Sequence, residues 1–202
     1  MQLQHMIVDD FFSDPMKIRE LALSNEFPER HANEVYPGRN STQLLDIHGI
    51  NQAICNIVQE PLTPMKHSSH LRPRLALEGD VGRDMSVHMD MCHWSAIVYL
   101  SLDEHCEGGT HFFRHNQTGW ETAPVWPGMA EAAGYQNPDA ALKAVMAQTN
   151  DPSAWTETMM LPMKFNRLVL FRGYLWHDAG RSFGTNKENG RLILPLFYDI
   201  AN

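Results

Sequence analysis

The second half of the chain is dominated by short, strongly apolar segments separated by turn-forming residues. The clearest are Trp94–Ser101 (WSAIVYLS), Arg167–Tyr174 (RLVLFRGY) and Arg191–Ile200 (RLILPLFYDI). Short runs that are apolar on both faces and rich in β-branched and aromatic residues are typical of buried strands. A chain that must bury several of them predicts a mainly β core, with its helices packed outside.

Weaker strand signals complete this core. They fall at Met6 to Phe12, Leu71 to Leu77, Ser86 to Asp90 and Thr110 to Arg114. The segment from Gly184 to Gly190, ahead of the last strand, has the composition of a hairpin loop. Short strands joined by turns predict a small β-barrel or sandwich. Pro195 removes a backbone donor, so we expect an edge or a bulge at that point of the last strand.

Residues 1–65 carry the expected N-terminal strand and helices. Ser13-Asp14-Pro15 combines a capping side chain with proline at the first helical position, which predicts a helix from Pro15 to about Asn25. A second helix is expected from Thr42 to Glu60. Its apolar stripe at core-facing spacing comprises Ile47, Ile50, Ile54, Ile57 and Val58.

Residues 118–160 interrupt the strand pattern with a polar, proline-punctuated stretch. We expect one helix in it, from Pro138 to Gln148, with Asn137 as its N-cap. Long connections without strands are often functional lids or binding loops. The aromatic residues that favour a lid over a surface excursion are Trp120, Trp126, Tyr135 and Trp155.

The length and charge of the chain restrict its class. A chain of 202 residues fits one domain, here residues 1–202. The net charge of −8 argues against a nucleic-acid partner, because such proteins present basic surfaces. The N-terminus lacks a signal-peptide pattern, and no apolar run is long enough to cross a membrane. Three cysteines without a CxxC pair fit a reducing compartment, so we expect a cytoplasmic protein.

Three residues form a candidate metal site. In a strand, side chains two residues apart point to the same face, so His88 and Asp90 can converge on one ion. His177 follows the apolar run that begins at Arg167, and a distant strand could bring it opposite. Two imidazoles and one carboxylate hold a ferrous ion on one face and leave three coordination positions open. Arg191 opens the last strand and could reach the same cavity from a neighbouring barrel strand.

The ordered set of these features resembles the Fe(II)/2-oxoglutarate-dependent dioxygenase superfamily. The resemblance covers about residues 70–200, apart from the insert at residues 118–160. It is closest in EGGTHFF (Glu107–Phe113) and NRLVLFRGYLWH (Asn166–His177). The N-terminal VDDFFSDP…YPGR stretch resembles small bacterial members of that superfamily. The resemblance implies a double-stranded β-helix core of the jelly-roll or cupin-like type.

The resemblance also implies roles for individual residues. His88, Asp90 and His177 would bind Fe(II), and Arg191 would pair with the far carboxylate of the cosubstrate 2-oxoglutarate. Arg181 is the rival anchor, although its Gly-Arg-Ser context suggests a turn. A tyrosine on a neighbouring strand, here Tyr99, would hydrogen-bond the same carboxylate.

The implied reaction consumes dioxygen and releases succinate and carbon dioxide. Related halogenases replace the carboxylate ligand with a small residue, so Asp90 favours hydroxylation of an unactivated C–H bond. The substrate class is a small molecule or an amino-acid or peptide residue. The sequence does not determine the oligomeric state.

Three alternatives stay open. The first is a non-catalytic or 2-oxoglutarate-independent metal-binding module with a cupin-like fold. The second reads His177-Asp178 as the dyad of a metal phosphohydrolase, against the strand-like flanking sequence. The third is a structural zinc site, although no CxxC pair supports it. Its ligands would come from His93, His105, His111 and His115 with Cys92 and Cys106.

Overall fold

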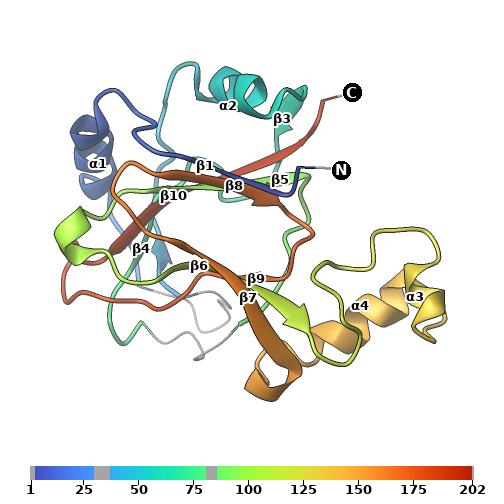
Figure 1. Ribbon diagram of the computed structural model, residues 1–202. Helices are drawn as coiled ribbons and strands as arrows, with labels where there is room; N and C mark the ends of the chain where they lie inside the picture. The colour runs from blue at the N-terminus through green and yellow to red at the C-terminus, as the bar shows by residue number, and fades with distance from the viewer. Residues whose placement is uncertain (1–2, 30–36, 81–85, 202) are drawn as a thin grey trace.

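The computed structural model describes residues 3–29, 37–80 and 86–201, and these form two antiparallel β-sheets (Figure 1). The larger sheet has seven strands in the described part of the chain: β1 (His5–Val8), β2 (Arg39–Asn40), β3 (Leu62–Pro64), β4 (Arg74–Ala76), β5 (Trp94–Tyr99), β8 (Leu168–Arg172) and β10 (Arg191–Ile200). The smaller sheet consists of β7 (Trp155–Pro162), β6 (Gly109–His115) and β9 (His177–Asp178), in that order. The double-stranded β-helix prediction is confirmed, but the described strands do not close into a barrel.

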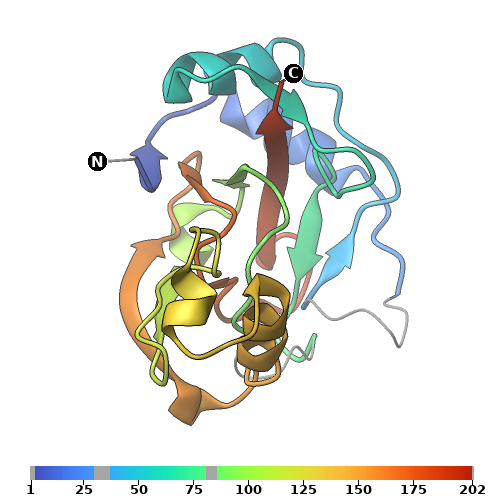
Figure 2. The same ribbon diagram turned by 90° about the vertical axis from the view of Figure 1, so that its right-hand side faces the viewer.

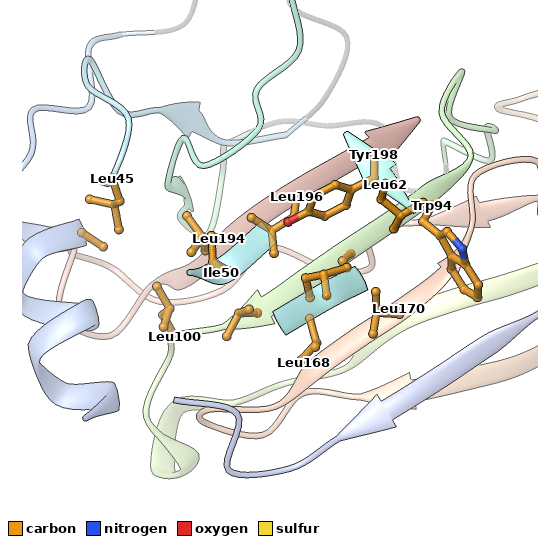
Figure 3. Close-up of a cluster of buried hydrophobic side chains, with 14 of the residues drawn as sticks. Leu45, Ile50, Leu62, Trp94, Leu100, Leu168, Leu170, Leu194, Leu196 and Tyr198 are labelled. Carbon is orange, nitrogen blue, oxygen red and sulfur yellow. The ribbon is translucent and has the colours of Figure 1, made fainter. Parts of the chain in front are cut away.

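The larger sheet buries both of its faces. Strands β8, β5 and β10 are adjacent, and β10 pairs with β5 from Ile193 opposite Tyr99 to Tyr198 opposite Trp94. Alternate residues of each strand point to opposite sides. Leucines 192, 194 and 196 pack under the helices, and Figure 3 shows leucines of β8 and β10 gathered beside Ile50. Burial on two faces explains why the three apolar runs carry no polar face.

The two N-terminal helices cover the outer face of the larger sheet (Figure 1). Helix α1 (Pro15–Leu23) begins as predicted, with the Asp14 side chain accepting a hydrogen bond from the Lys17 N–H. Helix α2 (Ile50–Val58) begins eight residues later than predicted. Loop contacts of the preceding segment explain this delay, because Leu45 N–H donates to the Leu71 carbonyl and Gly49 is left-handed at φ 78°.

A second cluster of apolar side chains fills the space between the two sheets. It combines residues of β5, β8 and β10 with residues of the smaller sheet, among them Ile97, Val169, Ile193, Phe112 and Leu161. Four large aromatic residues are also buried: Trp94, Trp176, Phe112 and Phe113. Side chains that share the inner face with this cluster are therefore shielded from water.

Pro195 occupies a gap along the edge of β10. Strand β4 pairs with residues 191–193 and β3 with residues 198–200, so no described strand pairs with Pro195 on that side. Its carbonyl accepts from the Leu71 N–H at 3.0 Å, and the N–H that proline lacks would point the same way. The expected edge position is confirmed, while the register with β5 runs through Pro195 without a bulge.

The segment from 118 to 160 is more structured than predicted. It contains α3 (Met129–Ala132), α4 (Pro138–Met146) and most of β7, which pairs with β6. Asn137 caps α4 as predicted, accepting from the Ala140 N–H. The expectation of no strand was wrong, because the exposed polar residues of WTETMMLP mask a strand whose pairing is decided by β6. Figure 2 looks onto the end of the sheets where α3 and α4 lie.

Two other strand predictions need correction. The strand expected from Leu71 begins at Arg74, since Leu71 is left-handed at φ 60° and cannot continue a strand. The strand expected over Ser86–Asp90 is reduced to a single bridge between His88 and His177. Two short 3₁₀ turns, η1 (Asp103–His105) and η2 (Pro152–Ala154), complete the elements. None of the helices in the described ranges combines the length and apolar character needed to cross a membrane.

Candidate metal centre

His88, Asp90 and His177 lie together at one end of the space between the sheets. Within residues 3–29, 37–80 and 86–201, they are the one group of three or more ligating side chains that could hold a metal, with ligand atoms within 4.8 Å of one another. The backbones of His88 and His177 exchange two hydrogen bonds of 2.9 Å, so the two histidines face each other across the bridge. Their ring centroids are 4.3 Å apart. The three predicted ligands are therefore brought together.

The two imidazoles are oriented in the same way. Nδ1 of His88 lies 2.8 Å from the Ser86 carbonyl, and Nδ1 of His177 lies 2.9 Å from the Leu175 carbonyl. A carbonyl only accepts, so each Nδ1 carries a proton, and Nε2 is the nitrogen of each ring that can bind a metal. Hydrogen bonds of this kind fix the tautomer that a metal requires.

The Asp90 carboxylate is the third candidate ligand, beside the two imidazoles. Its Oδ1 is 3.9 Å from Nε2 of His88, and its Oδ2 is 3.4 Å from Nε2 of His177. The backbone N–H of Asp90 donates to the Gly173 carbonyl at 2.8 Å. Gly173 has to be glycine, because a Cβ there would lie 2.2 Å from the Cys92 carbonyl oxygen. The loop that carries Asp90 is thus packed against the end of β8.

The electrostatics of His88 and Asp90 favour metal binding near neutral pH, whereas those of His177 favour a proton that a metal would have to displace. Burial, reinforced by the adjacent His177, lowers the pKa of His88 to about 4. Burial alone would raise the pKa of Asp90, but the neighbouring imidazoles outweigh it and hold that pKa at about 2. Burial alone would lower the pKa of His177, but the Asp90 carboxylate outweighs burial and raises it. A neutral imidazole and an ionised carboxylate are the forms that ligate.

Arg191 and Tyr99 lie on the inner face of the larger sheet. Arg191 is 3% exposed, and its Nε and Nη2 find no hydrogen-bond partner among the described residues. The Tyr99 hydroxyl lies 2.7 Å from Thr110 Oγ1, and burial raises its pKa, so it stays neutral. Arg181, the rival anchor, is exposed. A buried guanidinium with two donors unpartnered among the described residues points to an anionic ligand, because leaving such donors unpaired is costly.

The route by which Arg191 reaches the site differs from the prediction. We expected its strand to lie beside the strand of His177 in a closed barrel. Instead β9, which carries His177, pairs with β6 in the smaller sheet, whereas β10 belongs to the larger one. Arg191 therefore approaches from the opposite sheet, because the fold is two facing sheets.

The alternative metal sites find no support among the described residues. Asp178 does not act with His177 as a metal-binding dyad, because its carboxylate accepts from the backbone N–H groups of Ser86 at 2.7 Å and Gly180 at 2.5 Å. The histidines considered for zinc are engaged elsewhere or apart, as His111 with Glu157 and His115 with Thr118. No second cluster of ligating residues forms in the ranges that the structure covers.

Two residues support the ligands in a way that the sequence analysis did not predict. Asp178 holds Ser86, whose carbonyl orients His88. Ser95 donates to Asp90 Oδ2 at 2.5 Å. The spacing of Ser95 from Ile97 and Tyr99 on one strand places all three on one face, a signal that was present in the sequence. Asp178 gave no such signal, because its partner is a backbone group.

The insert contacts both histidine-bearing segments. Val87 N–H donates to the Thr149 carbonyl at 3.0 Å, and Trp176 N–H donates to the Glu121 carbonyl at 3.0 Å. Trp176 and Val87 also belong to the apolar cluster that the insert forms with Trp155. The insert therefore packs against, and hydrogen-bonds with, the segments that carry the two histidines.

The fold is a double-stranded β-helix, as the resemblance implied, and its triad could hold a metal ion. Similar solved structures include the α-ketoglutarate-dependent carbocyclase SnoK of nogalamycin biosynthesis (TM-score 0.56, 12% identity, covering 100% of this chain and 81% of SnoK). The epimerase SnoN of the same biosynthesis gives a TM-score of 0.53 at 14% identity, covering 98% of this chain and 79% of SnoN. HygX from Streptomyces hygroscopicus, with nickel and 2-oxoglutarate bound, gives 0.50 at 12% identity, covering 98% and 83%.

The chain belongs to DUF6445, a family of unknown function, whose model matches residues 2–198. A comparison with curated proteins found no match. At these identities the similar structures support the fold, and the chemistry of this chain has to be argued from its own site.

Proposed function

We propose that this protein is an Fe(II)- and 2-oxoglutarate-dependent oxygenase that hydroxylates an unactivated C–H bond of a small molecule or of an amino-acid or peptide residue. The observation that carries the proposal is the combination of two features contributed by the two facing sheets. One is a two-histidine, one-carboxylate triad, and the other is a buried arginine whose Nε and Nη2 have no partner among the described residues.

The residues present fit both the metal and the cosubstrate. Nε2 of each histidine and one oxygen of Asp90 would hold Fe(II), leaving the coordination positions that the cosubstrate and dioxygen need. Bound iron would let dioxygen act as the oxidant, with one oxygen atom entering succinate as 2-oxoglutarate loses carbon dioxide and the other entering the hydroxylated product. The chain contributes the ligand geometry and a site walled on one side by Phe171, whose ring meets His177 edge-on at 4.6 Å.

Arg191 would anchor the far carboxylate of 2-oxoglutarate. Its two unpartnered donors match the two oxygens of a carboxylate, and such charge-assisted pairs are strong in a buried site. The neutral Tyr99 hydroxyl would add a third donor, turning from its present partner Thr110. This arrangement orients the cosubstrate by its non-reacting end.

The reaction outcome follows from the ligand set. A carboxylate at position 90 occupies the place that a halide would need, so we propose hydroxylation. The similar structures include an epimerase and a carbocyclase, which shows that this fold supports more than one oxidative outcome. HygX has been crystallised with hygromycin B, a small molecule, which agrees with a small-molecule substrate here.

Binding of the two groups can be tested before any substrate is known. Anaerobic addition of Fe(II) and 2-oxoglutarate to the protein should produce a weak visible charge-transfer absorption. His177→Ala should abolish the absorption and the release of succinate, whereas His48→Ala, at an exposed histidine, should change neither. An unaltered absorption in the His177 variant would overturn the proposal.

A metal-binding module without 2-oxoglutarate is the alternative from a different class. It predicts that the triad binds metal while Arg191→Ala leaves the affinity for 2-oxoglutarate unchanged. The unpartnered donors of Arg191 argue against it, because a metal-binding module without this cosubstrate has no need of a buried cation at that position.

A further inference from the structure

Ser95 stands out among the residues around the metal centre that are not ligands. Its hydroxyl donates to Oδ2 of Asp90 at 2.5 Å, and the residue is 1% exposed. It lies on β5, between β8 and β10, opposite Phe171 on one side and Phe197 on the other. A serine in the middle of a buried sheet is held rigidly, so its hydroxyl is a fixed point for the carboxylate.

The Cys92 thiol determines how the Ser95 hydroxyl is used. Cys92 Sγ lies 3.1 Å from Ser95 Oγ, and Cys92 is buried. A serine hydroxyl has one hydrogen and an ionised carboxylate only accepts, so Ser95 must give that hydrogen to Asp90. The remaining contact then has the Cys92 thiol as donor and Ser95 Oγ as acceptor. The hydrogen bonds run in one direction, from Cys92 through Ser95 to Asp90.

These hydrogen bonds affect how the Asp90 carboxylate could bind a metal. A carboxylate can bind a metal through one oxygen or through both. Binding through both would consume one of the positions that must stay open on the iron. With Oδ2 engaged by Ser95, Oδ1 is the oxygen left without this competing hydrogen bond, on the side nearer His88.

We propose that Ser95, oriented by the Cys92 thiol, is a positioning residue that holds the Asp90 carboxylate as a one-oxygen ligand. The proposal rests on the proposed function, since it concerns the metal that the triad would bind. It assigns a role to two residues that are neither ligands nor cosubstrate contacts.

Titration of the metal-free protein with Co(II), followed by its visible absorption, tests this inference. Ser95→Ala should weaken Co(II) binding by about 10- to 100-fold, the effect typical of removing a partner of a ligand. It should also change the shape and intensity of the cobalt bands, because a carboxylate released from Ser95 can bind through both oxygens. Ser41→Ala, at another buried serine whose hydroxyl bonds Gln43 far from the site, should bind Co(II) like the unaltered protein.

Variants at position 92 separate positioning from a merely structural role. Cys92→Ala should weaken Co(II) binding less than Ser95→Ala does, and Cys92→Ser, which keeps a donor, should restore it. In the Ser95→Ala background, Cys92→Ala should have no further effect on affinity, because its influence passes through the Ser95 hydroxyl. If Ser95→Ala fails to fold, the Cys92 pair carries the test, and equal affinities for Cys92→Ala, Cys92→Ser and the unaltered protein overturn the proposal.

The outcomes distinguish this inference from the function on which it rests. Co(II) affinity and spectrum of Ser95→Ala equal to those of the unaltered protein would overturn the positioning role alone. Failure of the unaltered protein to bind Co(II), or binding that survives His177→Ala, would overturn the proposed metal site and this inference with it.

Discussion

At the residue scale, the role that we propose for Arg191 opposes its effect on stability. A buried guanidinium with two donors unpartnered within the described residues destabilises the fold unless a ligand pairs with it. We expect Arg191→Met to weaken 2-oxoglutarate binding by about 100-fold or more, since hydrogen bonds to charged groups contribute roughly 1.5–3 kcal/mol each. The same variant should unfold at an equal or higher urea concentration than the unaltered protein. Titration of the visible absorption and urea unfolding measure the two effects.

The matched control for this variant is Arg181→Met, which removes the exposed arginine. It should leave 2-oxoglutarate affinity unchanged. A large loss in the Arg181 variant with none in the Arg191 variant would transfer the anchor to Arg181.

Asp178 provides a second test at the same scale. Its carboxylate holds the Ser86 N–H, and the Ser86 carbonyl orients His88. Asp178→Ala should therefore weaken Co(II) binding by roughly tenfold. Asp178→Asn keeps a carbonyl acceptor and should lose less. Equal losses for both variants would show that the negative charge matters rather than the hydrogen bond.

At the element scale, the sequence predicts best where burial is complete. The last strand runs from Arg191 to Ile200 as expected, because both of its faces are covered and its pattern is continuously apolar. Strand β7 was missed, because most of its residues are exposed and its pairing with β6 decides its conformation. The start of α2 was wrong for a similar reason, since contacts of the loop with Leu71 override local helix propensity.

The candidate site, like the fold, could be predicted only in part from the sequence. The spacing of His88 and Asp90 and the apolar run before His177 predicted the three residues that the structure brings together. The placement of Arg191 in the opposite sheet was not predictable, because sequence order does not say which sheet a strand joins. Support from Asp178 was hidden as well, since backbone partners leave no pattern in the side chains.

An ion pair joins three elements near the Asp90 loop, and it should make stability depend on pH. Glu60, just beyond α2, accepts from Arg172 of β8 at 2.6 Å and from Trp94 of β5 at 3.1 Å. Burial opposes ionisation of Glu60, but hydrogen bonds from Arg172, His93 and Trp94 outweigh it and lower its pKa to about 2. A lowered pKa contributes stability that is present above the unfolded value of 4.5 and is lost as the pH falls through 2.

Glu60→Gln should therefore lower the free energy of unfolding at pH 6 by on the order of 2 kcal/mol. The difference from the unaltered protein should shrink between pH 4.5 and pH 2. Urea unfolding at several pH values measures it, with Glu20→Gln at an exposed site as the control. A difference that stays constant down to pH 2 would contradict the assignment of this pH dependence to Glu60.

At the scale of the whole molecule, the metal site joins the two sheets. His177 belongs to β9 of the smaller sheet, whereas Asp90 is hydrogen-bonded to Ser95 of β5 in the larger one. The insert contacts the segments of both histidines. A bound ion should therefore stabilise the entire fold, because it would connect His177 of the smaller sheet to Asp90, which is held by Ser95 of the larger sheet.

Thermal unfolding should show this stabilisation as two separate increases in Tm, one from the metal and one from 2-oxoglutarate. A metal at about 100 times its dissociation constant adds roughly 2.7 kcal/mol, which for a chain of this size raises Tm by about 5–10 °C. Anaerobic 2-oxoglutarate should add a second rise only when Fe(II) or Co(II) is present, and a chelator should reverse both. Arg191→Met should keep the first rise and lose the second, whereas His177→Ala should lose both. A 2-oxoglutarate shift of full size in metal-free protein would mean that Arg191 binds the dicarboxylate without the triad, and the two halves of the site would then be independent.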